Sequence, residues 1–496
     1  MMIRNLEHFL ARHLILIVNG RLAWHPAETC VRLFLCNQVR GSVVMRKNIT
    51  VRSLTSVSVV LLILHIFCPA GRARLKGGCA KVNITPPLGI PLIGSYGKPS
   101  DEILDDLYAK ALVLDDGTST VAIVSADLLY TPLEEITNPV RKIITEKIGI
   151  GPGNILLCAT HTHSGPEVFS KSKLRSDKRI DVSTVDRFYL ETLVKKLAGS
   201  VLLAHKNMQP VKIGAAKGEL PEIVFNRRPT DGSGLAKMTF SLTAEAGATR
   251  KVVTDSDGST RVTFDIPDGR GKLRFGPIDL EVCVLRVEDA DGAIVASLAN
   301  FGCHPVSIYP SRSTAISADY PGHAMRVVEQ AEGGLCLFTL GLAGNAVPFA
   351  RGVEPCRQLG TALGGEALRR LQFVSTTDNV TLRTVKRKIV FPTKKASSPD
   401  AVGETVTTEI QALKLGDIYV LGLPGEILIE VGLEIKRKAA LENLFIVTIS
   451  NDSIGYVCHS RAYDEGGYEP VSGTNLAKGA GEILINESLD LLKQLN

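Results

Sequence analysis

From about residue 75 to residue 496, short apolar runs alternate with stretches of helical periodicity, and this alternation limits the fold more than any other feature. The runs have the length of buried strands, and between them apolar residues recur every three or four positions, as in helices. This pattern is typical of an α/β protein in which helices cover the faces of a mixed sheet. No linker or sequence repeat interrupts it, so we expect one large domain over residues 75–496. The expected strands are residues 111–114, 121–125, 155–159, 281–287, 294–301, 335–340, 418–423 and 444–450, and the expected helices are residues 139–148, 185–204, 322–330, 357–371, 426–440 and 480–495.

The first 73 residues differ from the rest of the chain in charge. They contain nine Lys and Arg residues and two Glu residues, a net charge of +7; the whole chain carries +6, so the remainder carries −1. This distribution gives no reason to expect a nucleic-acid partner. Residues 45–73 have a basic start, an apolar run and small residues at the end, which is the arrangement of a secretory signal peptide. We therefore expect a secreted, periplasmic or envelope protein that starts at Met45, with residues 1–44 as a misassigned upstream extension; a membrane anchor formed by the uncleaved signal is the alternative.

Residues 230–271 break the alternation of strands and helices. The stretch is polar and rich in Gly and Asp, with the sequences TDGSG, DSDGS and DGRGK, which are typical of turns. We expect an insertion of hairpins and loops over one edge of the domain, and a lid is one interpretation of it.

Several apolar runs end just before polar residues that are useful in catalysis. His161 and His163 follow one run, His304 follows another, and Glu426 and Tyr456 follow two more. In open α/β sheets, ligands bind beyond the carboxyl ends of the strands, so these side chains are expected to meet. Side chains two positions apart in an extended segment also point to the same face, which brings the first two histidines together. Imidazoles with one carboxylate outline a zinc hydrolysis site, and a core histidine bonded to a backbone carbonyl is the alternative for one of the pair.

Four motifs, in this order, resemble the zinc-dependent neutral ceramidases. They are THTHSGP (160–166), NFGCHP (300–305), SADYPG (317–322) and LPGE (423–426). The resemblance covers roughly residues 78–490. It implies an α/β catalytic domain around one zinc ion and no C-terminal β-sandwich domain, which larger members of the family add. It also implies hydrolysis of an amide bond in a lipid or another small molecule, with possible contact to a membrane surface.

The resemblance also assigns roles to individual residues. It implies four zinc ligands: His161, His304, Glu426 and Tyr456. His163 would face the scissile group, and Tyr468 corresponds to a second family tyrosine that faces the substrate. Arg227 corresponds to the family arginine that helps to bind the substrate near the zinc, with the adjacent Arg228 as the alternative.

One turn departs from the family pattern. The family carries a serine, the presumed nucleophile, in a Gly-Asp-Val-Ser-Pro turn beside the metal. The corresponding turn here is GNAVP (344–348), in which Val347 replaces the serine and Asn345 replaces the aspartate. Because valine cannot act as a nucleophile, we expect attack by zinc-bound water, with His163 as the proton shuttle. Two alternatives stay open: a zinc hydrolase of a non-lipid amide, ester or lactone, and a zinc-containing binding protein without turnover.

Overall fold

The computed structural model divides the chain into two units, residues 1–72 and residues 73–496. It describes residues 75–95, 98–168, 186–266, 272–395 and 398–495, together with short strands between residues 13 and 50. The predicted signal peptide lies outside the described residues except for β6, so it stays a prediction, as does the upstream extension. The strands of the first unit are β1 (His13–Val18), β2 (Arg21–Pro26), β3 (Arg32–Cys36), β4 (Gln38–Val39), β5 (Ser42–Val43) and β6 (Ile49–Thr50).

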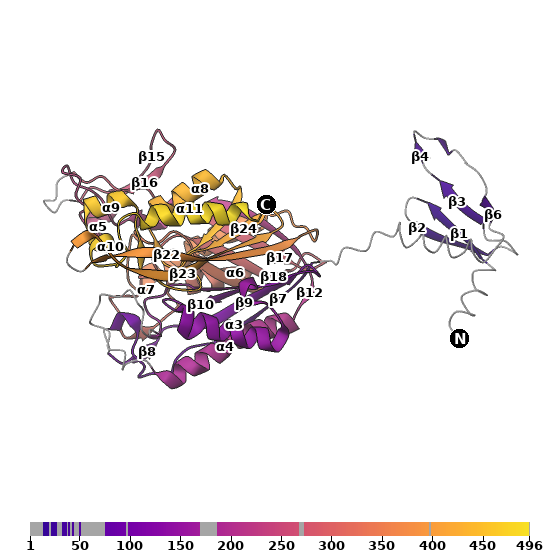
Figure 1. The fold of residues 1–496 in the computed structure, drawn as a ribbon, viewed down its shortest axis with the longest axis horizontal. Helices are drawn as coiled ribbons and strands as arrows, with labels where there is room; N and C mark the ends of the chain where they lie inside the picture. The colour runs from indigo at the N-terminus through magenta and orange to yellow at the C-terminus, as the bar shows by residue number, and fades with distance from the viewer. Residues whose placement is uncertain are drawn as a thin grey trace. The chain divides into compact units, whose positions relative to one another are not determined.

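Three main sheets make up the second unit (Figure 1). Their strand orders are β11-β10-β9-β7-β12, β13-β17-β18-β20 and β22-β23-β24-β26. The strands of the first sheet are β7 (Lys76–Asn83), β9 (Tyr108–Asp115), β10 (Thr120–Ala126), β11 (Ile155–Ala159) and β12 (Gln209–Pro210). Those of the second are β13 (Lys212–Glu219), β17 (Glu281–Glu288), β18 (Ile294–Phe301) and β20 (Leu335–Leu340). Those of the third are β22 (Leu382–Lys395), β23 (Ser398–Leu415), β24 (Ile418–Gly422) and β26 (Asn443–Val447).

The three sheets repeat one topology. In each, three neighbouring strands are antiparallel, and a fourth strand returns parallel to the third after a helix. A parallel return needs a long crossover, which a helix provides. The crossover helices are α3 (Asn138–Ile148), α6 (Asp319–Glu332) and α8 (Ile429–Ala439). A second helix follows each fourth strand and packs on the antiparallel strands of the same sheet; these helices are α4 (Arg187–Lys206), α7 (Val353–Leu371) and α11 (Ala480–Lys493).

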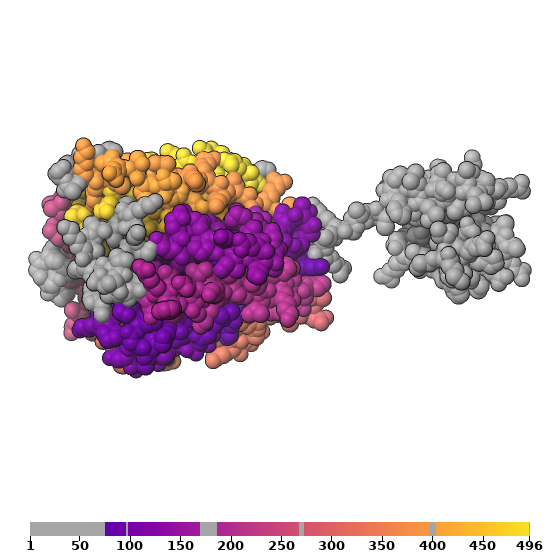
Figure 2. Space-filling model, turned by 60° about the horizontal axis from the view of Figure 1, so that its bottom comes forward, coloured from indigo at the N-terminus to yellow at the C-terminus, as the bar shows by residue number. Residues whose placement is uncertain are grey.

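We call these repeats the first module (residues 76–206), the second module (212–371) and the third module (382–493). In Figure 1, α3 and α4 of the first module lie on one side of the strands, and α8 and α11 of the third lie on the opposite side. Figure 2 shows the same separation on the surface, where the indigo to magenta residues and the orange to yellow residues occupy different regions. The sequence shows no repeat that would predict these modules, yet the structure of the second unit contains three similar parts.

The three sheets face a shared apolar core. Leu112 of the first sheet, Leu285 of the second and Leu413 of the third belong to this one buried cluster. Val113, the next residue along β9, belongs instead to the cluster beneath the helices. Because side chains alternate between the two faces of a strand, a strand buried on both faces reads as a continuous apolar run.

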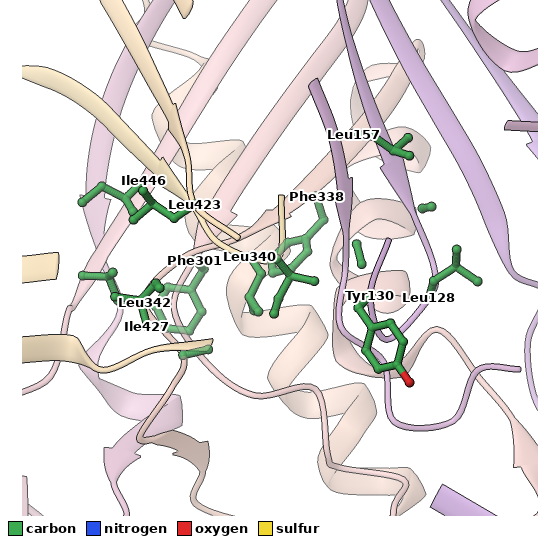
Figure 3. Packing of buried hydrophobic residues seen from close by; sticks show 14 of the residues in the cluster. Leu128, Tyr130, Leu157, Phe301, Phe338, Leu340, Leu342, Leu423, Ile427 and Ile446 are labelled. Atoms are coloured by element: carbon green, nitrogen blue, oxygen red, sulfur yellow. The ribbon is translucent and has the colours of Figure 1, made fainter. Parts of the chain in front are cut away.

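Buried apolar side chains also close the carboxyl ends of the central strands. Phe301, Leu340, Leu342, Leu423 and Ile427 lie close together there (Figure 3). Three short strand pairs complete this part of the fold, and one of them carries Glu426 and Tyr456. These pairs are β8 (Glu102–Ile103) with β19 (Ala315–Ile316), β14 (Val224–Asn226) with β21 (Ala346–Pro348), and β25 (Glu426–Ile427) with β27 (Tyr456–Val457).

The predicted α/β class, a mixed sheet with helices on its faces, is confirmed, although the strands are divided among three mixed sheets and do not form one. Each predicted strand and helix lies within four residues of an observed one at both ends. The predicted insertion contains α5 (Ala244–Ala248) and the hairpin of β15 (Lys251–Thr254) and β16 (Thr260–Thr263), and its role as a lid stays a prediction. Two short helices, α9 (Ser460–Glu465) and α10 (Tyr468–Val471), precede α11. Among the described residues, no helix combines the length and the hydropathy needed to cross a membrane.

Candidate metal centre

His161 and His163 lie in the loop after β11 and not on the strand itself. The strand ends at Ala159, and His161 has a φ of +70°, a left-handed conformation that non-glycine residues rarely adopt. The premise that an extended segment places both side chains on one face is therefore wrong. The turn nevertheless brings the two imidazole rings together, with 5.1 Å between their centroids.

Backbone carbonyl groups fix the orientation of two imidazoles. His161 Nδ1 lies 2.8 Å from the carbonyl oxygen of Leu129. His304, which follows β18, directs its Nδ1 at the carbonyl oxygens of Ala343 and, at 3.1 Å, Ala346. A carbonyl oxygen only accepts hydrogen bonds, so in neutral rings Nδ1 carries the proton in both histidines. The Nε2 lone pairs are then left to bind a cation, which is the arrangement usual for metal-binding histidines.

Glu426 brings a carboxylate to the same place. Its Oε2 lies 2.9 Å from His304 Nε2 and 3.4 Å from His161 Nε2. Glu426 belongs to strand β25, and α8 begins only at Ile429, so the prediction of a helix from residue 426 is three residues early. Tyr456 on β27 lies opposite Glu426 in the parallel pair, and its hydroxyl oxygen is 3.4 Å from His304 Nε2. The four predicted ligands therefore lie together.

The charge states of the centre suit a cation. Burial, assisted by the positive charge of Arg227, lowers the pKa of His304 to about 4, so this imidazole is neutral at neutral pH. Burial alone would raise the pKa of Glu426, but the imidazoles of His161 and His304 outweigh it and hold the pKa well below its ordinary range. Without an ion this lowering requires a proton on a facing Nε2 atom, and a bound cation would take the place of that proton. A neutral imidazole and an ionised carboxylate are the forms that bind a metal ion.

The donor atoms fit zinc. One nitrogen from each of His161, His163 and His304 lies within 4.8 Å of the others, and Glu426 contacts two of the three rings. His161 Nε2 is buried, and its contact with Glu426 Oε2 at 3.4 Å lacks the geometry of a hydrogen bond, so among the described residues this nitrogen is without the hydrogen bond that a buried imidazole nitrogen ordinarily makes. Zinc prefers nitrogen and oxygen ligands of this kind in a four-coordinate site. The three-histidine group includes His163, which the resemblance assigns to the substrate, so its role stays a prediction.

Aromatic rings and an arginine surround the centre. His163 stacks on Tyr309 with 5.7 Å between ring centroids, and Tyr468 lies 5.7 Å from Tyr456. The Arg227 guanidinium group lies over the rings of Phe240, Tyr456 and Tyr468 at 5.4 to 5.9 Å. The structure thus brings Tyr468 and Arg227 to the predicted site. Sequence reasoning missed Tyr309 and Phe240, because neither belongs to a motif and both reach the centre through loop conformation.

The turn at residues 344–348 is buried and structural. Val347 is fully buried, and it pairs with Phe225 where β21 meets β14. Asn345 is also fully buried, and its Oδ1 accepts a hydrogen bond of 2.9 Å from the backbone N–H of Ile429. Its carbonyl oxygen accepts a hydrogen bond from the backbone N–H of Arg227 at 2.8 Å. The turn therefore holds together elements that carry site residues and offers no nucleophilic side chain at position 347.

Part of the chain matches the sequence model of a known protein family. Residues 77–231 match the sequence model of the family described as neutral/alkaline non-lysosomal ceramidase, N-terminal. This part of the chain is similar to the neutral/alkaline ceramidase family. The matched region contains His161, His163 and Arg227, while His304 and the third module lie beyond it.

Two ceramidases of Dictyostelium discoideum are similar in sequence. Neutral ceramidase A is 24% identical over 253 residues, and neutral ceramidase B is 26% identical over 229 residues. Both alignments cover 45% of this chain, but only 30% and 26% of the two relatives. The aligned part of the chain therefore spans less than a third of the length of these relatives.

Two solved structures share the fold. The neutral ceramidase from Pseudomonas aeruginosa matches with a TM-score of 0.67 and 18% identity, over 85% of this chain and 74% of that chain. A ceramidase complexed with C2 matches with a TM-score of 0.64 and 17% identity, over 85% of this chain and 75% of that chain. At these identities the likeness establishes a ceramidase-like α/β fold across all three modules.

Proposed function

We propose that the protein is a zinc-dependent hydrolase that cleaves the amide bond of an N-acylated lipid, with ceramide as the first candidate because its relatives are named ceramidases. The observation that carries this proposal is the convergence of His161, His163, His304 and Glu426, with a buried and unbonded His161 Nε2 among the described residues. Zinc bound there would act as a Lewis acid on the amide carbonyl and would lower the pKa of water.

The side chains around the ion would transfer the proton, orient a ligand and contact the substrate. His163 is partly exposed, so it could take a proton from the attacking water and deliver it to the leaving nitrogen. Arg227 Nη2 donates a hydrogen bond of 3.1 Å to the Tyr456 hydroxyl and would hold that oxygen toward the ion. Tyr468, partly exposed beside Tyr456, would contact the substrate.

The surface near the centre supports an apolar substrate. Phe240, Tyr468 and Val471 are 42%, 41% and 63% exposed, and the rings of Phe240 and Tyr468 lie 6.0 Å apart. Exposed apolar side chains of this size beside a polar centre are typical of binding sites for apolar groups. An acyl chain could therefore lie against them while its amide group reaches the ion.

Metal analysis tests the first half of the proposal. Purified protein should contain about one zinc ion per chain, as expected for a single four-ligand site. The His161→Ala, His304→Ala double variant should contain none. His205→Ala, which changes a histidine on α4 away from the centre, serves as the matched control and should keep its zinc. Zinc-free wild-type protein with full activity would overturn the mechanism.

A substrate panel tests the second half. N-acyl amides of graded chain length should be cleaved with a kcat/KM that rises with chain length if the apolar surface binds the acyl chain. Short amides, esters and lactones belong in the same panel. A preference for the short compounds would favour a non-lipid substrate while leaving the zinc site in place.

Val347 favours a second candidate, a zinc-containing binding protein without turnover. The family position of the serine is a fully buried valine here, so the chain lacks that nucleophile. Wild-type protein that binds an N-acyl lipid but leaves every compound of the panel intact would support this candidate over the hydrolase.

A further inference from the structure

A fully buried carboxylate joins two neighbouring arginines behind the metal centre. Glu469 Oε1 accepts a hydrogen bond of 2.7 Å from Arg227 Nε, and its Oε2 accepts one of 2.6 Å from Arg228 Nη1. Burial would raise the pKa of Glu469, but the two guanidinium groups outweigh it and lower the pKa, so the carboxylate is ionised. Two charge-assisted hydrogen bonds of this length hold both arginines in defined orientations.

On one side, Glu469 fixes the group that faces Tyr456. With its Nε held by Glu469, Arg227 directs Nη2 at the Tyr456 hydroxyl oxygen, 3.1 Å away, and at the carbonyl oxygen of Gly344, 2.9 Å away. Since the guanidinium group is planar and rigid, the bond at Nε determines where Nη2 points.

On the other side, Glu469 anchors the helical turn that carries Tyr468. Glu469 follows Tyr468 directly in α10, and its partner Arg228 also donates a hydrogen bond of 2.8 Å to the carbonyl oxygen of Gly466. The chain passes very close to this arginine at Gly467, whose φ is +92°. A Cβ atom there would lie 2.8 Å from Arg228 Nη1, so only glycine fits without displacing the arginine.

The contacts continue outward as a series of alternating charges. Arg228 Nη2 lies 3.5 Å from Glu465 Oε2, and Glu465 Oε1 accepts a hydrogen bond of 2.9 Å from Arg461 on the surface. Glu469 is the innermost carboxylate of this series. It is also the one that contacts an arginine bonded to a predicted zinc ligand.

We propose that Glu469 is a positioning residue of the metal centre: it orients Arg227 toward the Tyr456 oxygen and places Tyr468 beside the same tyrosine. Within the described residues the Glu469 side chain makes its ion pairs with Arg227 and Arg228 and none with a predicted zinc ligand, so it would act through these neighbours. This inference rests on the proposed function, because it assigns a partner to a ligand of the proposed zinc site.

The test measures zinc affinity by competition with a chelator in wild type, Glu469→Gln and Glu469→Asp. The Gln variant keeps the size and removes the charge, and we expect zinc to bind about 10-fold to 100-fold more weakly. The Asp variant keeps the charge but shortens the side chain, and it should lie between the two. KM for an N-acyl amide should rise together with the loss of zinc affinity, because Tyr468 moves with α10.

Glu409→Gln is the matched control for a general loss of stability. Glu409 is a buried carboxylate that pairs with Arg141 at 2.6 Å and Lys386 at 3.0 Å, and over the described part of the chain neither partner forms a hydrogen bond or ion pair with a predicted site residue. This control should lower the melting temperature, but its zinc affinity should equal that of the wild type.

Three outcomes would contradict the role of Glu469, and a fourth would contradict the proposed function. Wild-type zinc affinity in a folded Glu469→Gln protein would overturn this role, and so would equal losses in Glu469→Gln and Glu409→Gln. Failure of both Glu469 variants to fold would assign this residue to the stability of the domain. Failure of the wild type to bind zinc would instead refute the proposed function itself, so the two failures can be told apart.

Discussion

Asn345 donates a hydrogen bond of 2.8 Å from its amide nitrogen to Glu430 Oε2. The family turn carries an aspartate at this position, and an aspartate here would place a second carboxylate against Glu430. Only an amide can satisfy Glu430 and the backbone N–H of Ile429 at the same time, since one end must donate and the other must accept. The asparagine at position 345 therefore suits the neighbouring carboxylate of Glu430 better than the family aspartate would.

Asn345→Asp should destabilise the protein by about 2 to 3 kcal/mol, because it removes a buried hydrogen bond and brings two carboxylates together. Chemical denaturation measures this loss. Glu430→Gln in the same chain should restore most of the stability, since the new amide can donate to the aspartate. A double variant no more stable than Asn345→Asp alone would contradict the pairing.

Val347→Ser should lower stability by about 1 to 3 kcal/mol, because it removes buried apolar atoms and buries a hydroxyl group. If the backbone of the turn keeps the geometry of the family, kcat/KM for an N-acyl amide should increase. Val347→Ala removes similar volume without adding a hydroxyl and is the control. An equal increase in both variants would indicate a larger pocket and not a new nucleophile.

Glu426→Gln should weaken zinc binding by at least about 100-fold. Mutation of a residue that only hydrogen-bonds to a metal ligand lowers metal affinity about 10-fold to 100-fold, and the loss of a direct ligand should be larger. The change keeps the size of the side chain and removes the charge that His161 and His304 face. Isothermal titration with zinc would measure the effect. Unchanged affinity would remove Glu426 from the set of ligands.

Asp127 should make stability depend on pH. Burial raises the pKa of this carboxyl group from 3.8 to about 6, so the folded protein favours the protonated form. The stabilising contribution is therefore fully present below pH 3.8 and is lost as the pH rises through 6. Asp127→Asn imitates the protonated group and can still accept the hydrogen bond that Asp127 Oδ2 accepts from the backbone N–H of Tyr108.

At pH 8 the Asp127→Asn variant should be more stable than the wild type by roughly 2 to 3 kcal/mol, and at pH 4 the two should be nearly equal. Urea denaturation with a chelator present separates this effect from metal binding. A constant difference between the two proteins across this range would show that Asp127 does not titrate as described.

The strands buried on both faces could be predicted from the sequence, but the exposed ones could not. The runs at β11, β18 and β20 are predominantly apolar and almost entirely buried, and their bounds agree with the prediction at every residue. β22 alternates buried and exposed residues and carries the sequence KRK in its middle, so it gave no apolar run. The division into three sheets depends on which strands pair, and neither composition nor periodicity determines pairing between distant segments.

The centre was predictable for a different reason. His161, His304, Glu426 and Tyr456 each follow an apolar run or a family motif, so their side chains could be assigned to one edge. The left-handed turn at His161 has no glycine to reveal it. Glu469 stands in no motif either, and its importance depends on two arginines more than 240 residues earlier in the chain.

The modular construction links metal binding to completion of the whole domain. His161 comes from the first module, His304 from the second, and Glu426 with Tyr456 from the third. No single module holds more than part of the predicted donor set, so a fragment ending before the third module would lack both predicted oxygen ligands. An ion bound at this junction would connect the three modules. Its release would therefore indicate that the modules have begun to separate. Metal retention would therefore measure assembly of the entire chain and not only the state of one loop.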